Sequence, residues 1–196
     1  MTRFVGLTGG IGAGKSEALA AFKRLGAATL STDRVTHELL DDDEVRAALI
    51  GRWGAGIAAG GSIDRNRVGE IVFADPEELA FLERVLHPRV GVHVFEWRQN
   101  LAPDTDLAVV EVPLLFEAAM DDAFDATVAV VADDRIREAR LHERGQPGLE
   151  GREERQLDQE EKERRADHVI RNEGSLDELE SKVRDVIDEI SAGGSG

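Results

Sequence analysis

The apolar residues of the chain follow two alternating patterns. Some segments are short and almost continuously apolar, and others repeat apolar residues every three to four positions, which is the spacing of one helix face. The short runs are typical of strands buried on both faces of a parallel sheet, so the chain predicts a doubly wound α/β domain. The strands expected from this pattern cover residues 3–8, 27–33, 107–112, 126–132 and 168–172.

A long helical block interrupts the expected sheet between its second and third strands. Residues 34–101 carry helical periodicity almost throughout, and Asp64 and Asp75 stand where the N-caps of two helices are expected. His87 and Pro88 lie between two periodic segments, and proline is well tolerated only in the first turn of a helix, so we expect a new helix to begin there. The helices expected in this block cover residues 34–40, 43–54, 65–73, 75–86 and 87–101.

Four further helices are expected around the sheet. The first ends at Gly26, a residue type that is common at helix C-termini. The last is preceded by Ser175, with Glu178 three residues later, which is the pattern of a capping box. These four helices cover residues 16–26, 134–144, 152–165 and 176–190.

The first strand and the first helix are joined by a loop that is almost without side chains. Residues 9–16 read GGIGAGKS and match G-x-x-x-x-G-K-[ST] at every fixed position, with the required strand before and helix after. Glycines let successive backbone N–H groups turn toward phosphate oxygens, and the positive end of the helix dipole adds to the same anion site. Lys15 can reach the β- and γ-phosphates, and the Ser16 hydroxyl can bind Mg²⁺. The sequence therefore predicts a nucleoside triphosphate site.

Glu17 is an unusual neighbour for a triphosphate. Many phosphate-binding loops carry a small hydroxyl residue at this position, whereas a carboxylate suits the helix dipole but repels phosphates. We expect the Glu17 side chain to turn outward, which leaves the α-phosphate to backbone groups. The residues predicted to bind the nucleotide in this segment are Gly10, Ile11, Gly12, Ala13, Gly14, Lys15, Ser16 and Glu17.

Composition and charge narrow the range of partners. The chain has 196 residues, enough for one domain with an inserted sub-domain, and it contains no cysteine, which excludes disulfides and thiolate metal sites. Its formal net charge of -16 lacks the basic footprint of a general nucleic-acid binder. No apolar run approaches the length of a bilayer span, and the N-terminus lacks a signal-peptide pattern. We therefore expect a cytoplasmic protein that binds neither nucleic acid nor membrane.

Three classes of nucleotide-binding protein remain: a small-molecule kinase, a GTPase-like switch and a non-catalytic binding module. The N-K-x-D guanine motif of the switch is missing. A kinase needs a base, and Asp33, at the end of the second expected strand, is a candidate for that base, for the N-cap of the following helix, or for both roles. Arg140 and Arg144 lie four residues apart, and they either reach the phosphates or pair with Glu138 and Glu143 at the surface.

Several segments together resemble the dephospho-CoA kinase family. The resemblance covers nearly the whole chain in the family's order, and IVFADPEE, LHP and VPLLFE are more specific than the phosphate loop, which many kinases share. The matching segments are GLTGGIGAGKS at residues 6–16, TD at 32–33 with HELL behind it, SIDRNRVGEIVFADPEE at 62–78, LHP at 86–88, VPLLFE at 112–117, RLHERG at 140–145 and ADHVIRNEGSLDEL at 166–179.

The resemblance implies an enzyme that transfers the γ-phosphoryl group of ATP to the ribose 3′-hydroxyl of dephospho-CoA, giving coenzyme A and ADP in the last step of coenzyme A biosynthesis. It also implies a P-loop NTPase-type parallel sheet of about five strands flanked by helices. Residues 1–33, 102–133 and 166–196 would form the nucleotide-binding core, 34–101 the helical acceptor-binding region, and 134–165 a mobile lid with its flanking helix. ATP, dephospho-CoA and Mg²⁺ are the small molecules expected to bind.

The resemblance also implies roles for single residues. Lys15 would serve the phosphates, Asp33 would be the base or the acid that orients the acceptor, and Arg140 would stabilise transition-state charge from the lid, so these three are the expected catalytic residues. Asn172 and Gly174 would lie near the adenine of ATP. The residues expected to bind the acceptor are Asp33, His87, Pro113, Leu114 and Arg140.

Two positions depart from the family's pattern. Many members carry an acid where this chain has Ser31, and a threonine or another neutral residue where it has Glu17. Two alternatives therefore stay open beside the family's reaction: a kinase for another nucleoside or nucleotide acceptor, and an ATP-binding regulatory module without catalysis. His87, which we expect at the entry of a helix, either faces the acceptor or has a structural role.

Overall fold

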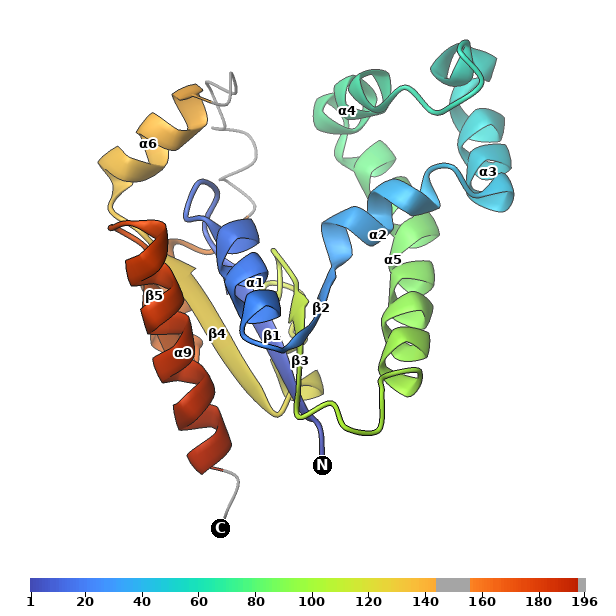
Figure 1. The fold of residues 1–196 in the computed structure, drawn as a ribbon. Helices are drawn as coiled ribbons and strands as arrows, with labels where there is room; N and C mark the ends of the chain where they lie inside the picture. The colour runs from blue at the N-terminus through green and yellow to red at the C-terminus, as the bar shows by residue number, and fades with distance from the viewer. Residues whose placement is uncertain (144–155, 194–196) are drawn as a thin grey trace. The chain divides into compact units, whose positions relative to one another are not determined.

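The computed structural model describes residues 1–143 and 156–193, and the chain folds into two compact units. The first unit combines Met1–Ser31 with Leu101–Gly196, and the second is formed by Thr32–Asn100. Figure 1 shows the sheet within the first unit and the helices of the second. In sequence, the second unit corresponds to the helical block between the second and third strands.

The first unit is built on a five-stranded parallel sheet with the strand order β2-β3-β1-β4-β5 (Figure 1). β1 pairs in parallel with β3 on one side and with β4 on the other, so the strand that precedes the phosphate loop lies in the centre of the sheet. The expectation of about five parallel strands is confirmed. The strands are β1 (Arg3–Gly9), β2 (Ala28–Ser31), β3 (Leu107–Glu111), β4 (Ala126–Val131) and β5 (His168–Arg171).

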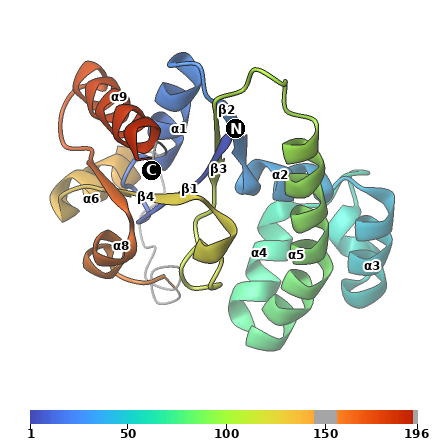
Figure 2. The same cartoon turned by 90° about the horizontal axis from the view of Figure 1, so that it is seen from below.

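Helices cover both faces of this sheet. α1 (Lys15–Arg24) and α9 (Leu176–Ala192) lie on one face, and α8 (Gln159–Arg165) lies on the other, as Figure 2 shows. α6 (Asp134–Glu143) follows β4. The capping box expected at the start of α9 is present, with both of its reciprocal hydrogen bonds.

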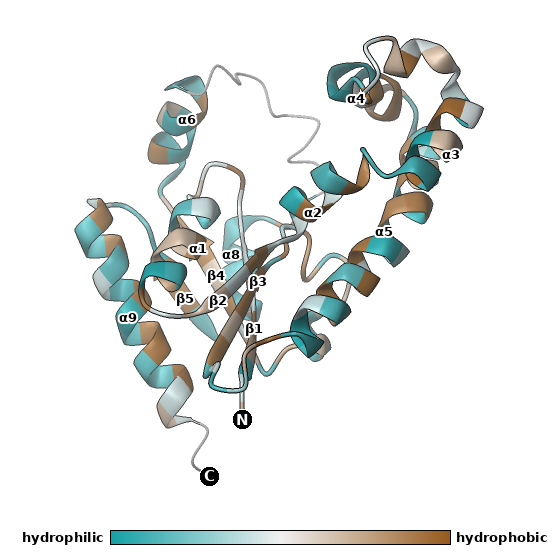
Figure 3. Cartoon of the chain, turned by 45° about the vertical axis from the view of Figure 1, so that its right-hand side comes forward, coloured by the Kyte–Doolittle hydropathy of each residue, from teal (hydrophilic) through white to brown (hydrophobic). Residues whose placement is uncertain are grey.

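The core of the first unit lies between the sheet and helices α1 and α9. Alternate strand residues face it, and Val5 and Leu7 of β1 and Val128 and Val130 of β4 are fully buried together with Phe22 of α1. Burying one such side chain stabilises a fold by about 1.5–3 kcal/mol. Figure 3 shows that the strands of the sheet are mostly hydrophobic (brown), whereas the helices carry large hydrophilic areas (teal).

The second unit is helical and has a hydrophobic core of its own, in which Val45, Leu49 and Leu86 are buried. The expected N-caps are confirmed, because the carboxylates of Asp64 and Asp75 accept hydrogen bonds from backbone N–H groups in the first turns of their helices. The elements of this unit are α2 (Thr32–Leu39), α3 (Asp43–Trp53), the 3₁₀ turn η1 (Ala55–Ala58), α4 (Arg65–Ala74) and α5 (Pro76–Gln99).

α5 shows that the expectation of two helices meeting at His87 is wrong. The helix continues through both segments with Pro88 inside it, so His87 lies in the middle of a helix rather than at its entry. Proline removes one backbone donor and crowds the preceding turn, which is a local loss. The Arg89 guanidinium donates to the Val85 carbonyl in this turn at 2.9 Å, and Leu86 is buried in the unit's core. Packing of the long helix outweighs the local defect.

The second strand is shorter than expected. β2 ends at Ser31 and α2 begins at Thr32, so Asp33 is the second residue of a helix. An N-cap precedes the first helical residue, and the N-cap interpretation of Asp33 is therefore wrong. The Asp33 side chain is exposed, and an acid in the first turn interacts favourably with the helix dipole.

The segment between β4 and β5 also differs from expectation. Residues 156–158 of the helix expected over 152–165 are not helical, so α8 begins at Gln159, and the Asp158 side chain caps it by accepting a hydrogen bond from the Glu161 N–H. Residues 144–155 of the expected lid, Arg144 among them, lie outside the described residues. Within the described ranges, no helix combines the length and apolarity needed to cross a bilayer.

Candidate active site

The loop between β1 and α1 is shaped by glycines at positions that favour this residue. Gly12 and Gly14 have φ angles of 78° and 95°, in the left-handed region. Gly14 is also the N-cap of α1, where no side chain caps the helix. A Cβ on Gly14 would collide with the side-chain amide of Asn172. The start of α1 therefore presents backbone N–H groups and the positive end of its dipole at this loop.

The carbonyl groups of the loop are held by side chains. The Lys15 ammonium donates to the Gly9 and Gly10 carbonyls at 2.9 and 3.1 Å. Nδ2 of Asn172 donates to the Ala13 carbonyl at 2.9 Å. In a trans peptide the N–H group points away from the carbonyl, so each of these bonds also orients the N–H that follows.

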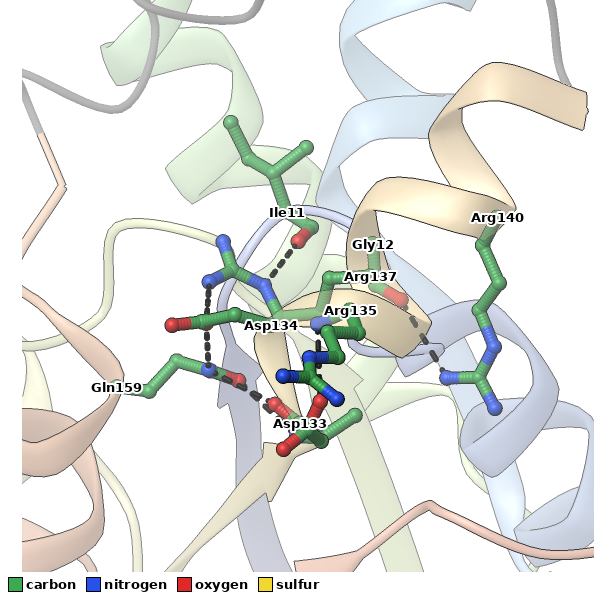
Figure 4. Close-up of polar contacts among 9 residues, drawn as sticks. Ile11, Gly12, Asp133, Asp134, Arg135, Arg137, Arg140 and Gln159 are labelled. Carbon is green, nitrogen blue, oxygen red and sulfur yellow. Dashed lines mark hydrogen bonds and ion pairs between the residues drawn. The ribbon is translucent and has the colours of Figure 1, made fainter.

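Arg140 reaches the same loop from α6. Its Nη1 lies 3.4 Å from the Gly12 carbonyl oxygen (Figure 4). The same Nη1 lies 3.2 Å from the Ala13 carbonyl oxygen, and Nη2 donates to the Asn172 carbonyl at 3.1 Å. In the part of the chain that the structure describes, Arg140 forms no ion pair with a carboxylate of its own helix. The alternative of surface pairing is therefore wrong for this residue.

Arg137 was not expected at the site, yet it contacts the loop from the same helix. Its Nε donates to the Ile11 carbonyl at 2.8 Å, and its Nη1 pairs with Asp134 at 2.8 Å (Figure 4). Only 15% of the Arg137 side chain is exposed. The one sequence signal for it is its spacing of three residues from Arg140, which places both side chains on one helix face.

A known family matches both the sequence and the fold along nearly the whole chain. A family model described as dephospho-CoA kinase matches residues 3–178. A dephospho-CoA kinase from Symbiobacterium thermophilum is 37% identical over 187 residues, which cover 92% of this chain and 78% of the relative. The chain belongs to the dephospho-CoA kinase family.

Two solved structures agree with this family assignment. TT1252 from Thermus thermophilus has a TM-score of 0.81 at 33% identity and covers 96% of this chain and 97% of its own. A dephospho-CoA kinase from Campylobacter jejuni has a TM-score of 0.70 at 28% identity, covering 98% and 99%. The expected P-loop NTPase-type fold and the enzyme class, a kinase, are confirmed. Neither another acceptor nor a module without catalysis gains support.

In this dephospho-CoA kinase fold, a buried lysine links α8 to the loop after β3. Lys162 is fully buried, and its Nζ donates to Oε1 of Glu117 at 2.9 Å and to the Pro113 carbonyl at 2.8 Å. The Thr8 hydroxyl donates to the same carbonyl at 3.2 Å. Burial lowers the pKa of Lys162, and the hydrogen bond and charge of Glu117 oppose this shift. Pro113 is thus held through its carbonyl, and Leu114 beside it is half-buried.

The first turn of α1 carries a hydroxyl group next to the glycine loop. Ser16 and Glu17 are both exposed there. Among the described residues, no group of three His, Cys, Asp or Glu side chains could hold a metal by itself. Mg²⁺ commonly takes one or two protein oxygens together with waters and substrate phosphates. The Ser16 hydroxyl beside the glycine loop fits a site of that kind.

The other predicted residues are divided between the two units. Asn172 contacts the phosphate loop, and a Cβ on Gly174 would displace the Glu178 carboxylate from its position in the capping box. The role of both residues near adenine stays a prediction. Asp33 on α2 and His87 on α5 belong to the second unit and are exposed. Their roles toward the acceptor also stay predictions.

Proposed function

We propose that this protein transfers the γ-phosphoryl group of ATP to the ribose 3′-hydroxyl of dephospho-CoA, producing coenzyme A and ADP. Membership of the dephospho-CoA kinase family supports this acceptor. The glycine loop with Lys15 at its end supports the triphosphate donor. The observation that carries the assignment of roles is the position of Arg140, whose guanidinium contacts the phosphate loop.

Residues of the first unit bind and orient the triphosphate. The N–H groups of the loop and the N-terminus of α1 face the phosphate oxygens and stabilise their negative charge. Lys15, which holds two loop carbonyls in the structure, moves to the β- and γ-phosphates. Arg140 stabilises the charge on the transferring group, a role in which an arginine contributes a factor of about 10³–10⁵ to kcat.

Asp33 acts on the acceptor. It accepts the proton of the 3′-hydroxyl while that oxygen attacks the γ-phosphorus. A new P–O ester bond forms, the bond from the γ-phosphorus to the bridging oxygen breaks, and ADP leaves with the electron pair. Because Ser31 replaces the acid that many family members carry, this role rests on Asp33 alone. His87, Pro113 and Leu114 bind the acceptor in this proposal.

We assign Mg²⁺ to the Ser16 hydroxyl together with the phosphates of ATP. When bound there, the ion would neutralise negative charge on the phosphates. The exposed position of the hydroxyl, next to a loop in which Gly12 and Gly14 have left-handed backbone angles, supports this assignment. We also place the reaction in the cytoplasm, because ATP is supplied there.

The experiment that tests the reaction follows ADP release with ATP, Mg²⁺ and dephospho-CoA. Parallel reactions contain adenosine, AMP or no acceptor. We expect turnover only with dephospho-CoA, and a product phosphorylated on the 3′-hydroxyl of the ribose. Turnover with a different acceptor would retain a kinase and overturn the proposed substrate.

The variant Asp33→Asn tests the base. We expect kcat to fall by about 10²–10⁴ while the KM for ATP stays unchanged, since proton transfer alone is removed. Asp41→Asn is the matched control, because Asp41 is an exposed acid in the turn after α2. It should keep wild-type turnover. If the two variants turn over equally fast, Asp33 is not the base.

A further inference from the structure

The five carbonyls of the phosphate loop ahead of Gly14 all accept hydrogen bonds from side chains. Four of them are held by residues that were expected at the site. The central carbonyl belongs to Ile11, and Nε of Arg137 donates to it at 2.8 Å (Figure 4). Since the N–H of a trans peptide points opposite to its carbonyl, this bond aims the Gly12 N–H away from Arg137. Arg137 thus fixes the peptide in the middle of the loop.

Arg137 is itself held in place. Its Nη1 pairs with Asp134, one turn earlier in α6, at 2.8 Å, and Nε2 of Gln159 lies 3.4 Å from the same carboxylate oxygen. Gln159 is bound in turn to both backbone groups of Ala132, at 3.0 and 2.9 Å. A guanidinium restrained in this way has little rotamer freedom left to lose when a ligand binds.

The loop fits closely against these side chains. A Cβ on Gly10 would lie 3.0 Å from Cγ of Gln159 and 3.4 Å from Nη2 of Arg137. A Cβ on Gly12 would lie 3.1 Å from the Arg137 carbonyl oxygen. The N-terminal turns of α6 and α8 therefore pack against one side of the loop. Both the backbone and the side chain of Arg137 take part in this packing.

We propose that Arg137 is a positioning residue for nucleotide binding, which holds the loop through the Ile11 carbonyl so that the N–H groups face the phosphates. Because it acts through the backbone of the loop, it contributes to the binding of ADP as much as to that of ATP. Arg140 differs, since its proposed role concerns the transferring group. This inference rests on the proposed function only in that the loop binds ATP, and it does not depend on the acceptor.

The test is isothermal titration calorimetry with ATP and with ADP in the absence of acceptor. The variants are Arg137→Ala, Arg137→Gln and the control Arg135→Ala, which makes the same change in net charge at an exposed position of the same helix. We expect Arg137→Ala to weaken ATP and ADP by the same factor, about tenfold, as for one lost charge-assisted hydrogen bond. Arg137→Gln keeps an N–H donor and should recover part of the loss, while Arg135→Ala should bind like wild type.

Two results would overturn the proposal. One is nucleotide affinity in Arg137→Ala equal to that of Arg135→Ala. The other is a loss for ATP alone, since Arg137 would then contact the γ-phosphate directly. Thermal unfolding without nucleotide identifies a variant that does not fold, and Arg137→Gln then decides the matter. If wild type binds ATP but leaves dephospho-CoA unphosphorylated, the proposed function fails, whereas the binding series still decides the role of Arg137.

Discussion

The ammonium group of Lys162 lies 2.9 Å from Oε1 of Glu117, and the lysine side chain is completely buried. Lys162 also donates to the Pro113 carbonyl at 2.8 Å, so it joins α8 to the loop after β3. Replacing the lysine leaves the Glu117 carboxylate without a compensating charge. We therefore expect Lys162→Met to lower the free energy of unfolding by about 3–5 kcal/mol, which urea denaturation measures.

A double variant distinguishes the destabilisation caused by the unpaired Glu117 charge from that caused by loss of the Lys162 side chain. Lys162→Met with Glu117→Gln removes both charges and keeps an acceptor for the Leu157 N–H, which bonds to Oε1 of Glu117 at 2.8 Å. Uncharged residues often replace a buried ion pair without net loss, so most of the stability should return. Arg164→Met, at an exposed position of α8, should stay within about 1 kcal/mol of wild type. A Lys162→Met variant as stable as Arg164→Met would contradict the prediction.

Gly14 and Gly26 have nearly the same backbone strain but different surroundings. Their φ angles are 95° and 97°, and a Cβ on Gly14 would collide with Asn172, whereas a Cβ on Gly26 would meet nothing within 4 Å. A left-handed alanine costs about 1–2 kcal/mol at either position. We expect Gly26→Ala to show only this loss in urea denaturation and to bind ATP normally.

Gly14→Ala should suffer the same strain and, in addition, push the Asn172 amide off the Ala13 carbonyl that it holds at 2.9 Å. We expect its affinity for ATP to fall by more than about tenfold, because the loop N–H groups lose their orientation. Calorimetry with ATP on both variants measures this difference. Similar affinities in Gly14→Ala and Gly26→Ala would show that the clash has no effect on the loop.

Local signals explain which parts of the site were predictable. The glycine loop and Lys15 are consecutive in the chain, so strand, loop and helix could be recognised together. Arg137 and Lys162 are different, because their contacts with Ile11 and Pro113 join residues 126 and 49 positions apart. Both lie in a tract rich in acids and bases, and such a pattern is typical of a solvated surface. Their burial follows from tertiary packing alone.

The elements that were misjudged show the same limit. The unfavourable effect of proline on a helix acts within one turn. The continuity of α5 through Pro88 depends instead on burial of Leu86 in a hydrophobic core to which other helices of the unit contribute. The end of β2 was also misplaced, since Thr32 and Asp33 suit the end of a strand and the first turn of a helix equally well. Boundaries of this kind are settled by tertiary context.

Glu78 offers a test of electrostatics in the second unit. Its carboxylate accepts hydrogen bonds from Nε and Nη2 of Arg52 at 2.9 and 2.7 Å and from Nε1 of Trp53 at 2.8 Å. The bonds from Arg52, and then that from Trp53, lower the pKa of Glu78 below its ordinary 4.5. A carboxyl group with a lowered pKa in the folded state contributes stability above its unfolded pKa, and this is lost as the pH falls through the lowered value. We expect the fluorescence of Trp53, isolated in a Trp97→Phe variant, to change with a midpoint below pH 4.5.

Arg52→Gln in the same background identifies the cause. The charged donor is removed while an amide N–H remains, so the pKa of Glu78 should rise and the midpoint should move up toward 4.5. Trp53→Phe in the otherwise wild-type chain is the control, because the remaining Trp97 has no bond to Glu78 in the structure described and should not report this step. A midpoint that Arg52→Gln leaves unchanged would mean that the transition is not the titration of Glu78.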